Sequence, residues 1–476
     1  MDPGNNIRNL NVLSKREQTI ATRYSDGETY TLIAEALFIA PSTVRNHLSK
    51  IYRKLDINSK VELINVIAQQ AGDTPGEPIQ YEKPSIAVLP FTNMSDGPGN
   101  EYFSDGITED IITGLSRFRD LFVIARSSTF VFKGQSVNVS EVASKLGVRF
   151  VVEGSVRKDD QKIRITAQLI DAESRNHIWA EHYDRKMMDL FEVQDEVTQA
   201  ICATLMGRVE QASKKRIKRK ADENLNAYDY FLQGRESLFK MTPSANKRAK
   251  ELFEKAVSIN PEYAAAYAGL AEAYLSDWVT GWSNKSSLSL GWDYAHKSVS
   301  IDDSDSRAHT VYGAACYWCR EYDEAEFHLQ RALTLNPGDT RALVHMARYQ
   351  FLVGEPERSV AFAKEASVIN PFGKIGIYQG QAFYAARQYS EAIQAFKTVQ
   401  DPIALIYGWL AMSYIQSDRQ FEAKEAAERF ETQAKNEILI RKTSEGWGEF
   451  YSERWPFKNP EDLEHMLSGL RKAGLA

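Results

Sequence analysis

The stretch Thr29–Lys54, TYTLIAEALFIAPSTVRNHLSKIYRK, decides how the first part of this chain folds. Apolar residues recur at helical spacing between Leu32 and Leu37, which predicts a short amphipathic helix. Pro41 then marks a helix start, because proline is tolerated in the first turn, where its missing N–H removes no hydrogen bond. The second helix turns one apolar face inward, formed by Val44, Leu48, Ile51 and Leu55. The stretch therefore predicts two short helices joined by a tight turn.

The outward side of the second predicted helix is polar and basic. Arginine and asparagine can form bidentate hydrogen bonds with base edges in the major groove, and lysines can neutralise phosphates. A solvated basic helix is the alternative, and four basic residues on one short helix do not decide between the two. The residues on this outward side are Arg45, Asn46, His47, Ser49, Lys50, Arg53 and Lys54.

The wider context favours nucleic-acid binding, because residues 13–69 resemble the LuxR-type helix-turn-helix domain along their whole length. The resemblance includes LSKRE at 13–17, SDG at 25–27, STVRNHL at 42–48 and IYRKL at 51–55. It implies that the bases are faced by Arg45, Asn46 and Ser49. It implies that the DNA backbone is faced by Thr43, His47, Lys50 and Lys54. Some relatives carry a longer basic residue at the position of Ser49, so the sequence preference stays open.

A further helix is expected at 59–70, with Val61, Ile64 and Ile67 on one stripe. In LuxR-type domains this helix pairs with its twin and places two recognition helices one DNA turn apart. The alternative is that the stripe completes the domain's own core, and periodicity alone does not choose between them. Residues 1–70 are therefore expected to form a four-helix helix-turn-helix domain that binds double-stranded DNA as a homodimer.

The composition is that of a soluble globular protein, and 476 residues suggest roughly three domains. The net charge of −6 excludes a polycation that coats nucleic acid, so a basic DNA-binding module on an acidic body fits a specific regulator. Three cysteines, Cys202, Cys316 and Cys319, are too few for a disulfide framework. No signal peptide and no run of roughly 18 apolar residues is present, so we expect a bacterial cytoplasmic protein without a membrane span.

Residues 71–84 are rich in proline and glycine and predict a linker. Residues 85–186 then alternate short apolar strands with helices and end in three β-type runs, with a turn at Asp159-Asp160. This pattern predicts a central α/β sandwich domain. Carboxylates within it, such as Glu109-Asp110, lie on helical faces without matched partners and are expected at the surface.

The same region resembles the TolB amino-terminal domain and its FlgO-like relatives. The resemblance rests on SIAVLPF at 85–91, YFSDG at 102–106, VEGSVR at 152–157 and AQLID at 167–171. It implies no activity. Three polar residues within it could line a ligand cleft, although roles in turns and helix caps are the favoured interpretation. They are Ser104, Asp105 and Arg157.

Residues 187–226 predict a connecting helix that ends in the basic run KKRIKRK at 214–220. The run could contact DNA phosphates, or it could be a solvated helix end, which is the favoured interpretation. Residues 227–436 repeat a helix-pair pattern with a period near 34, as between Pro337 and Pro371. They predict an α-solenoid of tetratricopeptide repeats whose groove suits a protein or peptide partner, and 437–476 would cap it.

Cys316 and Cys319 form a C-x-x-C pair inside a predicted repeat helix, where buried structural cysteines are favoured over a metal or redox site. No G-x-x-x-x-G-K-[ST] phosphate loop occurs. We therefore expect no catalytic residues, no cofactor and no metal site.

The sequence as a whole predicts a multidomain, mostly α-helical transcription regulator rather than an enzyme. Its α/β and repeat half would sense or assemble with a partner. The alternative is an interaction scaffold in which the repeats bind a partner and DNA binding is secondary.

Overall fold

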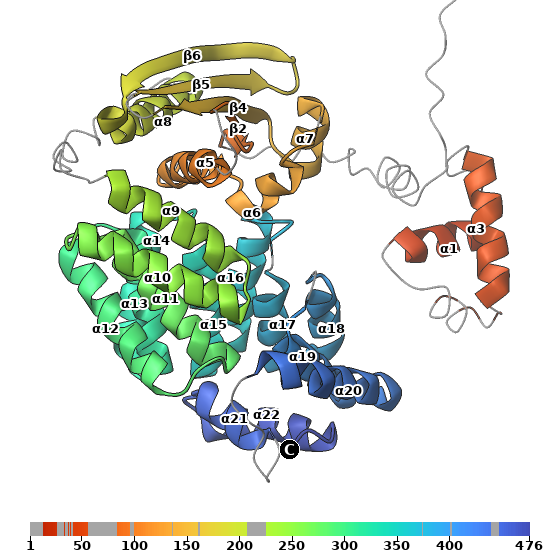
Figure 1. The fold of residues 1–476 in the computed structure, drawn as a ribbon. Coiled ribbons are helices and arrows are strands. Elements are labelled where there is room, and N and C mark those ends of the chain that lie inside the picture. Colours follow the sequence, from red (N-terminus) through yellow and green to blue (C-terminus); the bar gives the residue numbers. More distant parts are fainter. Residues whose placement is uncertain are drawn as a thin grey trace, which may run out of the picture. The chain divides into compact units, whose positions relative to one another are not determined.

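The computed structural model describes residues 13–25, 33, 37, 39, 41–55, 83–95, 100–135, 137–159, 162–206, 225–373, 375–399, 402–438 and 447–476. The chain divides into two units, Met1–Glu82 and Lys83–Ala476, which are described separately (Figure 1). Four expectations lie outside the described residues. They are most of the first helix of the helix-turn-helix, the helix at 59–70, the linker as far as Glu82, and the basic run at 214–220.

The first unit is built on α1 (Lys15–Ser25) and α3 (Pro41–Leu55), which pack against each other. Ser14 caps α1 reciprocally with Glu17: the Ser14 N–H donates to Glu17 Oε2 at 2.8 Å, and Glu17 N–H donates to Ser14 Oγ at 3.3 Å. The core of the unit consists of Leu13, Ile20, Ala21, Ile33, Val44, Leu48, Ile51 and Leu55. The predicted inward face of the second helix is therefore confirmed.

The second unit begins with a mixed sheet in the order β3-β1-β4-β5-β6, with β2 also paired to β4. Its strands are β1 (Ser85–Val88), β2 (Thr92–Asn93), β3 (Phe122–Val123), β4 (Phe150–Lys158), β5 (Lys162–Asp171) and β6 (Asn176–Lys186). β1 runs parallel to β3 and to β4, whereas β4, β5 and β6 form an antiparallel meander. The predicted strands and the hairpin after β4 are confirmed.

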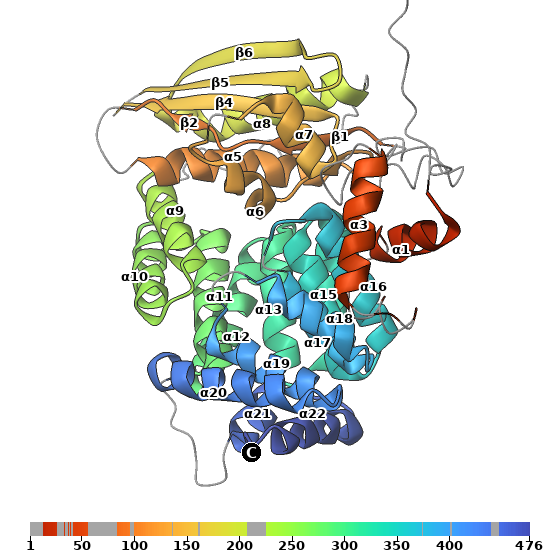
Figure 2. The ribbon, with the colours of Figure 1, turned by 90° about the vertical axis from the view of Figure 1, so that its right-hand side faces the viewer.

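Helices cover both faces of this sheet in part. α5 (Glu101–Ser116) and α8 (Leu190–Met206) share one hydrophobic core with β4 and β5, and α7 (Val139–Leu146) covers the other face near β1 (Figures 1 and 2). Two short elements, α6 (Arg126–Thr129) and the 3-10 turn Phe130–Phe132, were not predicted, and a second 3-10 turn, Met187–Asp189, precedes α8.

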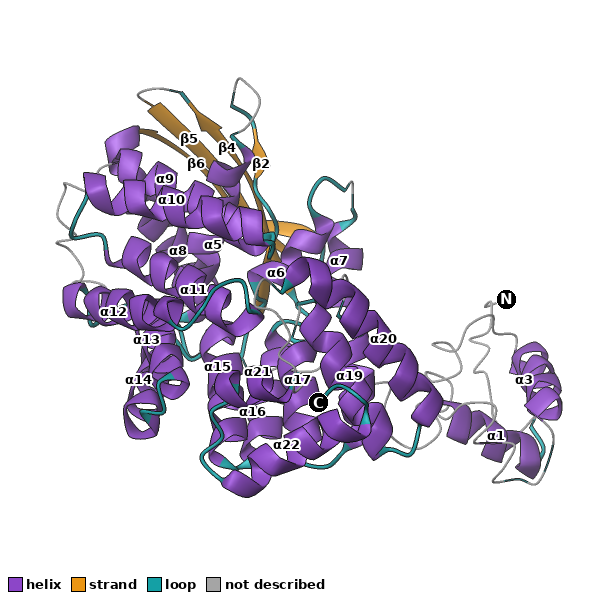
Figure 3. Ribbon diagram, turned by 60° about the horizontal axis from the view of Figure 1, so that its bottom comes forward, coloured by secondary structure: helices purple, strands orange, loops and turns teal. Residues whose placement is uncertain are grey.

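The described part of 225–438 consists of consecutive antiparallel helix pairs, as Figure 3 also shows. The pairs are α9 (Leu225–Phe239) with α10 (Pro243–Ile259), α11 (Ala264–Thr280) with α12 (Ser286–Ile301), α13 (Ser306–Trp318) with α14 (Tyr322–Leu335), α15 (Thr340–Val353) with α16 (Pro356–Ile369), α17 (Gly376–Ala385) with α18 (Tyr389–Lys397), and α19 (Ala404–Gln416) with α20 (Gln420–Glu437). Close helix crossings require glycine: a Cβ at Gly234 or Gly269 would lie 2.6–2.7 Å from the ring of Phe253. The predicted succession of helix pairs of the tetratricopeptide type is therefore confirmed.

The C-terminal segment does more than cap the last pair. It contains α21 (Gly448–Arg454) and α22 (Pro460–Lys472), of which only the second was predicted. Arg454 Nε donates to the Trp278 carbonyl at 2.9 Å, Lys458 N–H donates to the Leu352 carbonyl at 2.8 Å, and Trp455 packs edge-on against Trp318 and Trp409. The segment therefore ties α11, α13, α15 and α19 together.

The α/β part rests on the turns between successive repeats. Asn336 and Asn370, each followed by proline, stand 34 residues apart at equivalent turns. Asn336 Nδ2 donates to Ser116 Oγ at 3.2 Å, and Asn370 Oδ1 accepts from Ser128 Oγ at 2.6 Å. Asn370 Nδ2 also donates to Ser127 Oγ at 3.1 Å, and Ala125 N–H donates to the Ile369 carbonyl at 2.9 Å. The equivalent turns that follow α14 and α16 thus dock the sheet domain.

Replacing Asn370 by alanine should loosen this docking. The change removes both side-chain hydrogen bonds from a buried position, which costs about 1–3 kcal/mol. We expect faster amide hydrogen exchange in β3 and α6 of the full-length protein. The matched control is Asn260→Ala, because Asn260 also precedes a proline but its side chain accepts from the Glu262 N–H within its own turn. Equal effects of the two changes on β3 would contradict the docking role.

Candidate nucleic-acid interface

Helix α3 positions the candidate DNA-contacting residues by its packing. Its buried stripe, in which no residue is more than 5% exposed, comprises Val44, Leu48, Ile51 and Leu55. Successive helical residues turn by about 100°, so the other positions fall on defined sides of the helix. A stripe about 90° from the buried one comprises Thr43, His47, Lys50 and Lys54. The backbone positions roughly opposite the core comprise Asn46, Ser49 and Arg53, whereas Arg45 lies about 90° from the buried stripe on the other flank.

The side chains of the flanking stripe are described and differ in exposure. Thr43 and His47 are half-buried, whereas Lys50 and Lys54 are exposed. The side chains of Arg45, Asn46, Ser49 and Arg53 lie outside the described residues. The four residues that the resemblance assigns to the DNA backbone therefore share one flank of the helix, whereas Arg45, Asn46, Ser49 and Arg53 spread over the rest of its polar side.

Lys54 has an intramolecular partner that the sequence did not indicate. Its Nζ donates to both carboxylate oxygens of Glu17, at 2.9 and 2.7 Å, and so links α3 to the start of α1. The hydrogen bonds from Lys54 and Ser14 lower the pKa of Glu17 from its ordinary 4.5 to about 2. Any contact between Lys54 and a phosphate would have to share this ammonium group with Glu17.

A second set of functional side chains, in the other unit, was missed by the sequence analysis. Glu109 of α5 is only 5% exposed and faces three arginines from different elements. Its Oε2 lies 2.6 Å from Arg235 of α9 and 3.2 Å from Arg126 of α6, and its Oε1 lies 3.3 Å from Arg341 of α15. The expectation that Glu109 is a surface carboxylate without partners is wrong.

The electrostatics of this ion cluster are set by burial and by arginine together. Burial alone would raise the pKa of Glu109, but Arg235, Arg126 and Arg341 hold it at about 2. Its neighbour Asp110 is also paired, since Arg235 lies 3.3 Å from it and the Tyr228 hydroxyl donates to it at 2.5 Å. The cluster therefore joins α5 and α6 of the sheet domain to the first and fourth helix pairs.

The three polar residues weighed as a ligand cleft are held within the chain. Ser104 lies in the first turn of α5 and donates to the Glu101 carbonyl at 3.0 Å. Asp105 binds Lys133 Nζ at 2.7 Å, while burial raises the pKa of Asp105. Arg157 is exposed within β4, so its assignment to a turn or cap is wrong. No common cleft is formed by these contacts.

The C-x-x-C pair lies at the end of α13, as expected from its place in a repeat helix. Cys316 is buried and Cys319 is half-buried, and burial raises the pKa of the Cys316 thiol to about 12. Within the described ranges, no three His, Cys, Asp or Glu side chains gather to hold a metal ion. None of the helices in these ranges combines the length and the apolar composition that crossing a membrane requires.

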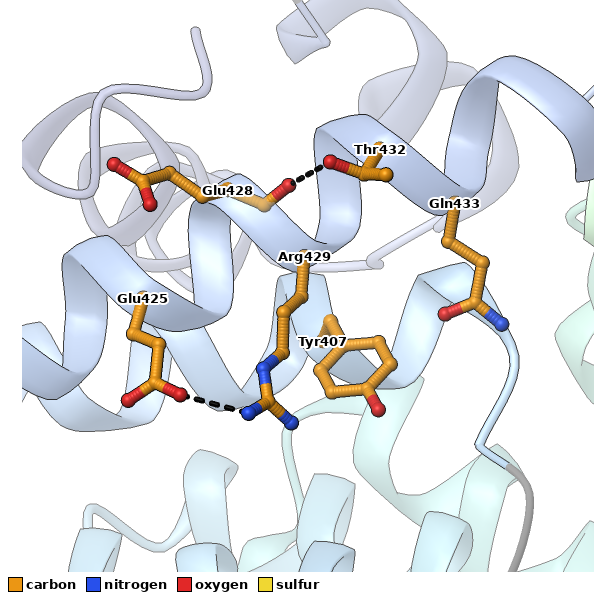
Figure 4. A pocket seen from close by; sticks show the side chains of 6 residues that line it. All are labelled: Tyr407, Glu425, Glu428, Arg429, Thr432 and Gln433. Carbon is orange, nitrogen blue, oxygen red and sulfur yellow. Dashed lines mark hydrogen bonds and ion pairs between the residues drawn. The ribbon is translucent and has the colours of Figure 1, made fainter.

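A shallow hollow lies on α19 and α20 (Figure 4). Its side chains bond to one another: Arg429 pairs with Glu425 at 2.7 Å, and the Thr432 hydroxyl donates to the Glu428 carbonyl at 2.8 Å. Because these groups are satisfied along their own helix, the hollow offers no convergent polar site for a ligand.

Comparison with known families adds to this geometry. The profile of the bacterial regulatory proteins of the luxR family matches residues 11–67. The chain carries a LuxR-type regulatory domain. A second profile, that of the second domain of HilA/YgeH-like transcriptional regulators, matches residues 82–200. The LuxR-type domain is thus followed by a domain that also occurs in transcription regulators, and the repeats follow it.

Individual relatives cover parts of the chain. "Putative adenylate cyclase 3" of Rhizobium meliloti (strain 1021) is 40% identical over 246 residues, which are 51% of this chain and 42% of that protein. "Transcriptional regulator HilA" of Salmonella paratyphi A is 21% identical over 298 residues, which are 60% of this chain and 51% of that protein. The chain therefore spans about half the length of the curated relatives it matches. A tetratricopeptide repeat protein from Parabacteroides merdae superposes with a TM-score of 0.35 and 12% identity, covering 59% of this chain and 97% of that one.

The Lys54–Glu17 ion pair leads to a prediction about acid stability. Glu17→Gln keeps an oxygen that can accept from Ser14 N–H but loses the charge. Because the pKa of Glu17 is lowered on folding, its contribution to stability is present above about pH 4.5 and is lost as the pH falls towards 2. We expect faster hydrogen exchange of α1 in E17Q than in wild type at pH 6, with the difference fading in acid. Lys54→Met should cause the same faster exchange of α1 at pH 6. If the effects of Glu17→Gln and Lys54→Met added up in the double variant, that result would contradict a direct ion pair between the two side chains.

The ion cluster leads to a prediction about global stability. Glu109→Gln leaves Arg235, Arg126 and Arg341 without their shared carboxylate, and breaking a buried ion pair costs about 3–5 kcal/mol. Denaturant unfolding of the full-length protein should register this loss. The control is Glu101→Gln on the same helix, whose exposed ion pair with Lys133 contributes at most about 1 kcal/mol. Similar unfolding midpoints for the two variants would contradict the proposed importance of the cluster.

Proposed function

We propose that this protein is a sequence-specific, DNA-binding transcription regulator whose α/β and repeat half senses or assembles with a partner. The observation that carries the proposal is the LuxR-family match at residues 11–67, which include α3 with its buried stripe on one side. The match to the second domain of HilA-like regulators at 82–200 supports it independently.

The proposed roles of the α3 residues follow from their position around the helix. Asn46, on the side opposite the core, and Arg45, on the flank next to it, would read bases together with Ser49, because arginine and asparagine suit bidentate contacts to guanine and adenine. Arg53, also opposite the core, would meet a phosphate. Thr43, His47 and Lys50, on the other flank, would contact the DNA backbone. Lys54 would join them while retaining its bond to Glu17.

Pairing of two LuxR-type domains is part of the proposal. Two recognition helices placed one DNA turn apart would read a roughly two-fold symmetric site, and residues 59–70 carry the apolar stripe that suits such a contact. The proposed divisions of the chain are 1–70 for DNA binding, 71–84 as a linker, 85–186 as the α/β domain, 187–226 as a connector, 227–436 as repeats and 437–476 as the C-terminal segment.

The partner would bind the repeats. Stacked helix pairs offer an extended surface suited to a peptide or protein segment, and part of that surface is already covered by α5 and by the C-terminal segment. A partner would therefore use the remaining repeat surface. Because the sheet domain is docked on the repeat turns, a partner that binds the repeats would affect the repeats and the sheet domain together.

The proposed regulator is non-enzymatic and works in the bacterial cytoplasm. The name of the Rhizobium relative raises cyclase activity as a point to test, although this chain spans only 42% of that protein. Incubation of the full-length protein with ATP and a divalent metal should yield no cyclic AMP. Formation of cyclic AMP would contradict the non-enzymatic assignment.

The first experiment is selection of bound fragments from a genomic DNA pool by the full-length protein at near-physiological salt, where non-specific binding fades. Wild type should enrich a shared, roughly two-fold symmetric motif. Arg45→Ala should lose about 1–3 kcal/mol of discrimination at one position of each half-site. Lys50→Ala, the matched control, should weaken all sites alike and lower the salt slope by about 1.

The same experiment decides against the alternative function. An interaction scaffold in which DNA binding is secondary would give no enrichment, or an enrichment that Arg45→Ala leaves unchanged. Either result would contradict the proposed regulator and direct attention to the repeat surface.

A further inference from the structure

Among the residues that the structure describes, strand β6 pairs with another strand on one side alone, at the edge of the sheet. It spans 11 residues and lies on the side of the sheet away from the repeats (Figures 1 and 2). The opposite edge, at β3, is covered, because Ala125 N–H donates to the Ile369 carbonyl and Phe122 packs on the fourth helix pair. An uncovered edge strand of this length is a template for pairing with another strand.

The register shows which backbone groups of β6 face outward. Hydrogen-bonded pairs alternate along an antiparallel ladder. Asp159 N–H donates to the Lys162 carbonyl, so the even-numbered residues of β5 bond to β4 and the odd-numbered ones bond to β6. Tyr183 pairs with Ile165 and therefore points its N–H and C=O inward. The residues whose N–H and C=O point outward are Ala180, His182, Asp184 and Lys186. Within the described ranges, none of these four has a backbone partner on its outer side, and the Asp184 carbonyl accepts from the Arg185 side chain at 3.1 Å.

The charges of β6 are ordered so that the strand complements a second copy of itself. The sequence around Tyr183 is Glu-His-Tyr-Asp-Arg. If two copies pair antiparallel with Tyr183 at the two-fold axis, Glu181 of each lies opposite Arg185 of the other. His182 then lies opposite Asp184 in a hydrogen-bonded pair, which matches the outward direction of both. Opposite charges directly across a strand pair are stabilising, and like charges are not.

Exposed apolar side chains flank this strand. Ile178, in the bulge near its start, is 42% exposed, and Met188, just after its end, is 68% exposed. The pairing about Tyr183 brings Ile178 of one copy to the same end of the ladder as Met188 of the other. The register that matches the charges therefore also gathers the two exposed apolar groups.

We propose that β6 is a homodimer interface, at which two copies of the chain pair antiparallel about Tyr183 and form one continuous sheet. The role of this interface rests on the proposed function. In a dimeric regulator, the β6 interface would be a second contact between the two copies besides the DNA-binding domains. Charged edge strands also keep sheets apart in monomers. The complementary order of these charges favours pairing over protection, and on pairing Arg185 would exchange its 3.4 Å ion pair with Glu196 for one with Glu181 of the other copy.

Charge reversal with rescue tests the proposal in the full-length protein. Glu181→Arg places two arginines opposite each other at both ends of the pair, and Arg185→Glu places two glutamates there. Each variant alone should elute with half the wild-type mass in size-exclusion chromatography with light scattering, and an equimolar mixture of the two should recover the dimer mass. Lys145→Glu, an exposed reversal on α7, is the control and should leave the mass unchanged.

A second variant tests the backbone contribution. His182→Pro removes an outward N–H while leaving the bonds to β5, since proline is tolerated at an edge whose N–H faces solvent. It should also halve the mass. A monomeric wild type, a dimer that survives both His182→Pro and Glu181→Arg, or a mixture that stays monomeric would overturn the proposal, as would a complex in which β6 pairs with a different protein instead.

The test separates this proposal from the proposed function. A β6-dependent dimer that enriches no DNA motif would contradict the regulator and leave the interface standing. A monomer that enriches a motif sensitive to Arg45→Ala would overturn the interface and leave the regulator standing.

Discussion

One buried carboxylate, Glu109, has to be compensated by arginines from three separate parts of the second unit. Glu109 is nearly inaccessible to water, and an isolated charge in that position would cost several kcal/mol. The arginines that offset this cost come from α6, α9 and α15, so the cluster forms only when the sheet domain, the first helix pair and the fourth helix pair are in place together. Apolar packing supplies the bulk of the attraction, since α5, α8 and α9 to α11 share one core. The ion cluster fixes the relative positions of the elements that it joins, because its hydrogen bonds tolerate little displacement.

Much of the fold follows from local sequence patterns, whereas the contacts between elements far apart in the sequence do not. Three features were predictable because each is visible in the order of nearby residues. They are the buried stripe of α3, the strands β4 to β6, and the 34-residue period of the repeats. Glu109 was assigned to the surface because helical spacing says which residues share a face but not what that face meets. Its partners stand up to 232 residues away. The same reason hid the bond between Lys54 and Glu17, which are 37 residues apart. α21 was missed because seven residues are too few to show a period.

The DNA-binding unit combines stability and recognition in one helix. α3 supplies four of the buried residues of its core and, on its other sides, all of the candidate contacts. Lys54 belongs to both sets, since it anchors Glu17 and stands in the flanking stripe. A phosphate that approached Lys54 would compete with the Glu17 carboxylate. The binding free energy gained at that position would therefore be the difference between two ion pairs. Lys50, one helical turn earlier and exposed, has no carboxylate partner among the described residues of this unit.

The C-terminal segment has a consequence for how the protein is made. Arg454 and Trp455 close contacts with α11, α13 and α19, yet they are synthesised after all of these helices. During translation the repeats leave the ribosome with the tryptophans of these helices uncovered and with the Trp278 carbonyl lacking its arginine. The helix pairs can therefore stack before the residues that cover their tryptophans have been made, and the contacts of Arg454 and Trp455 are added to a solenoid that is already present.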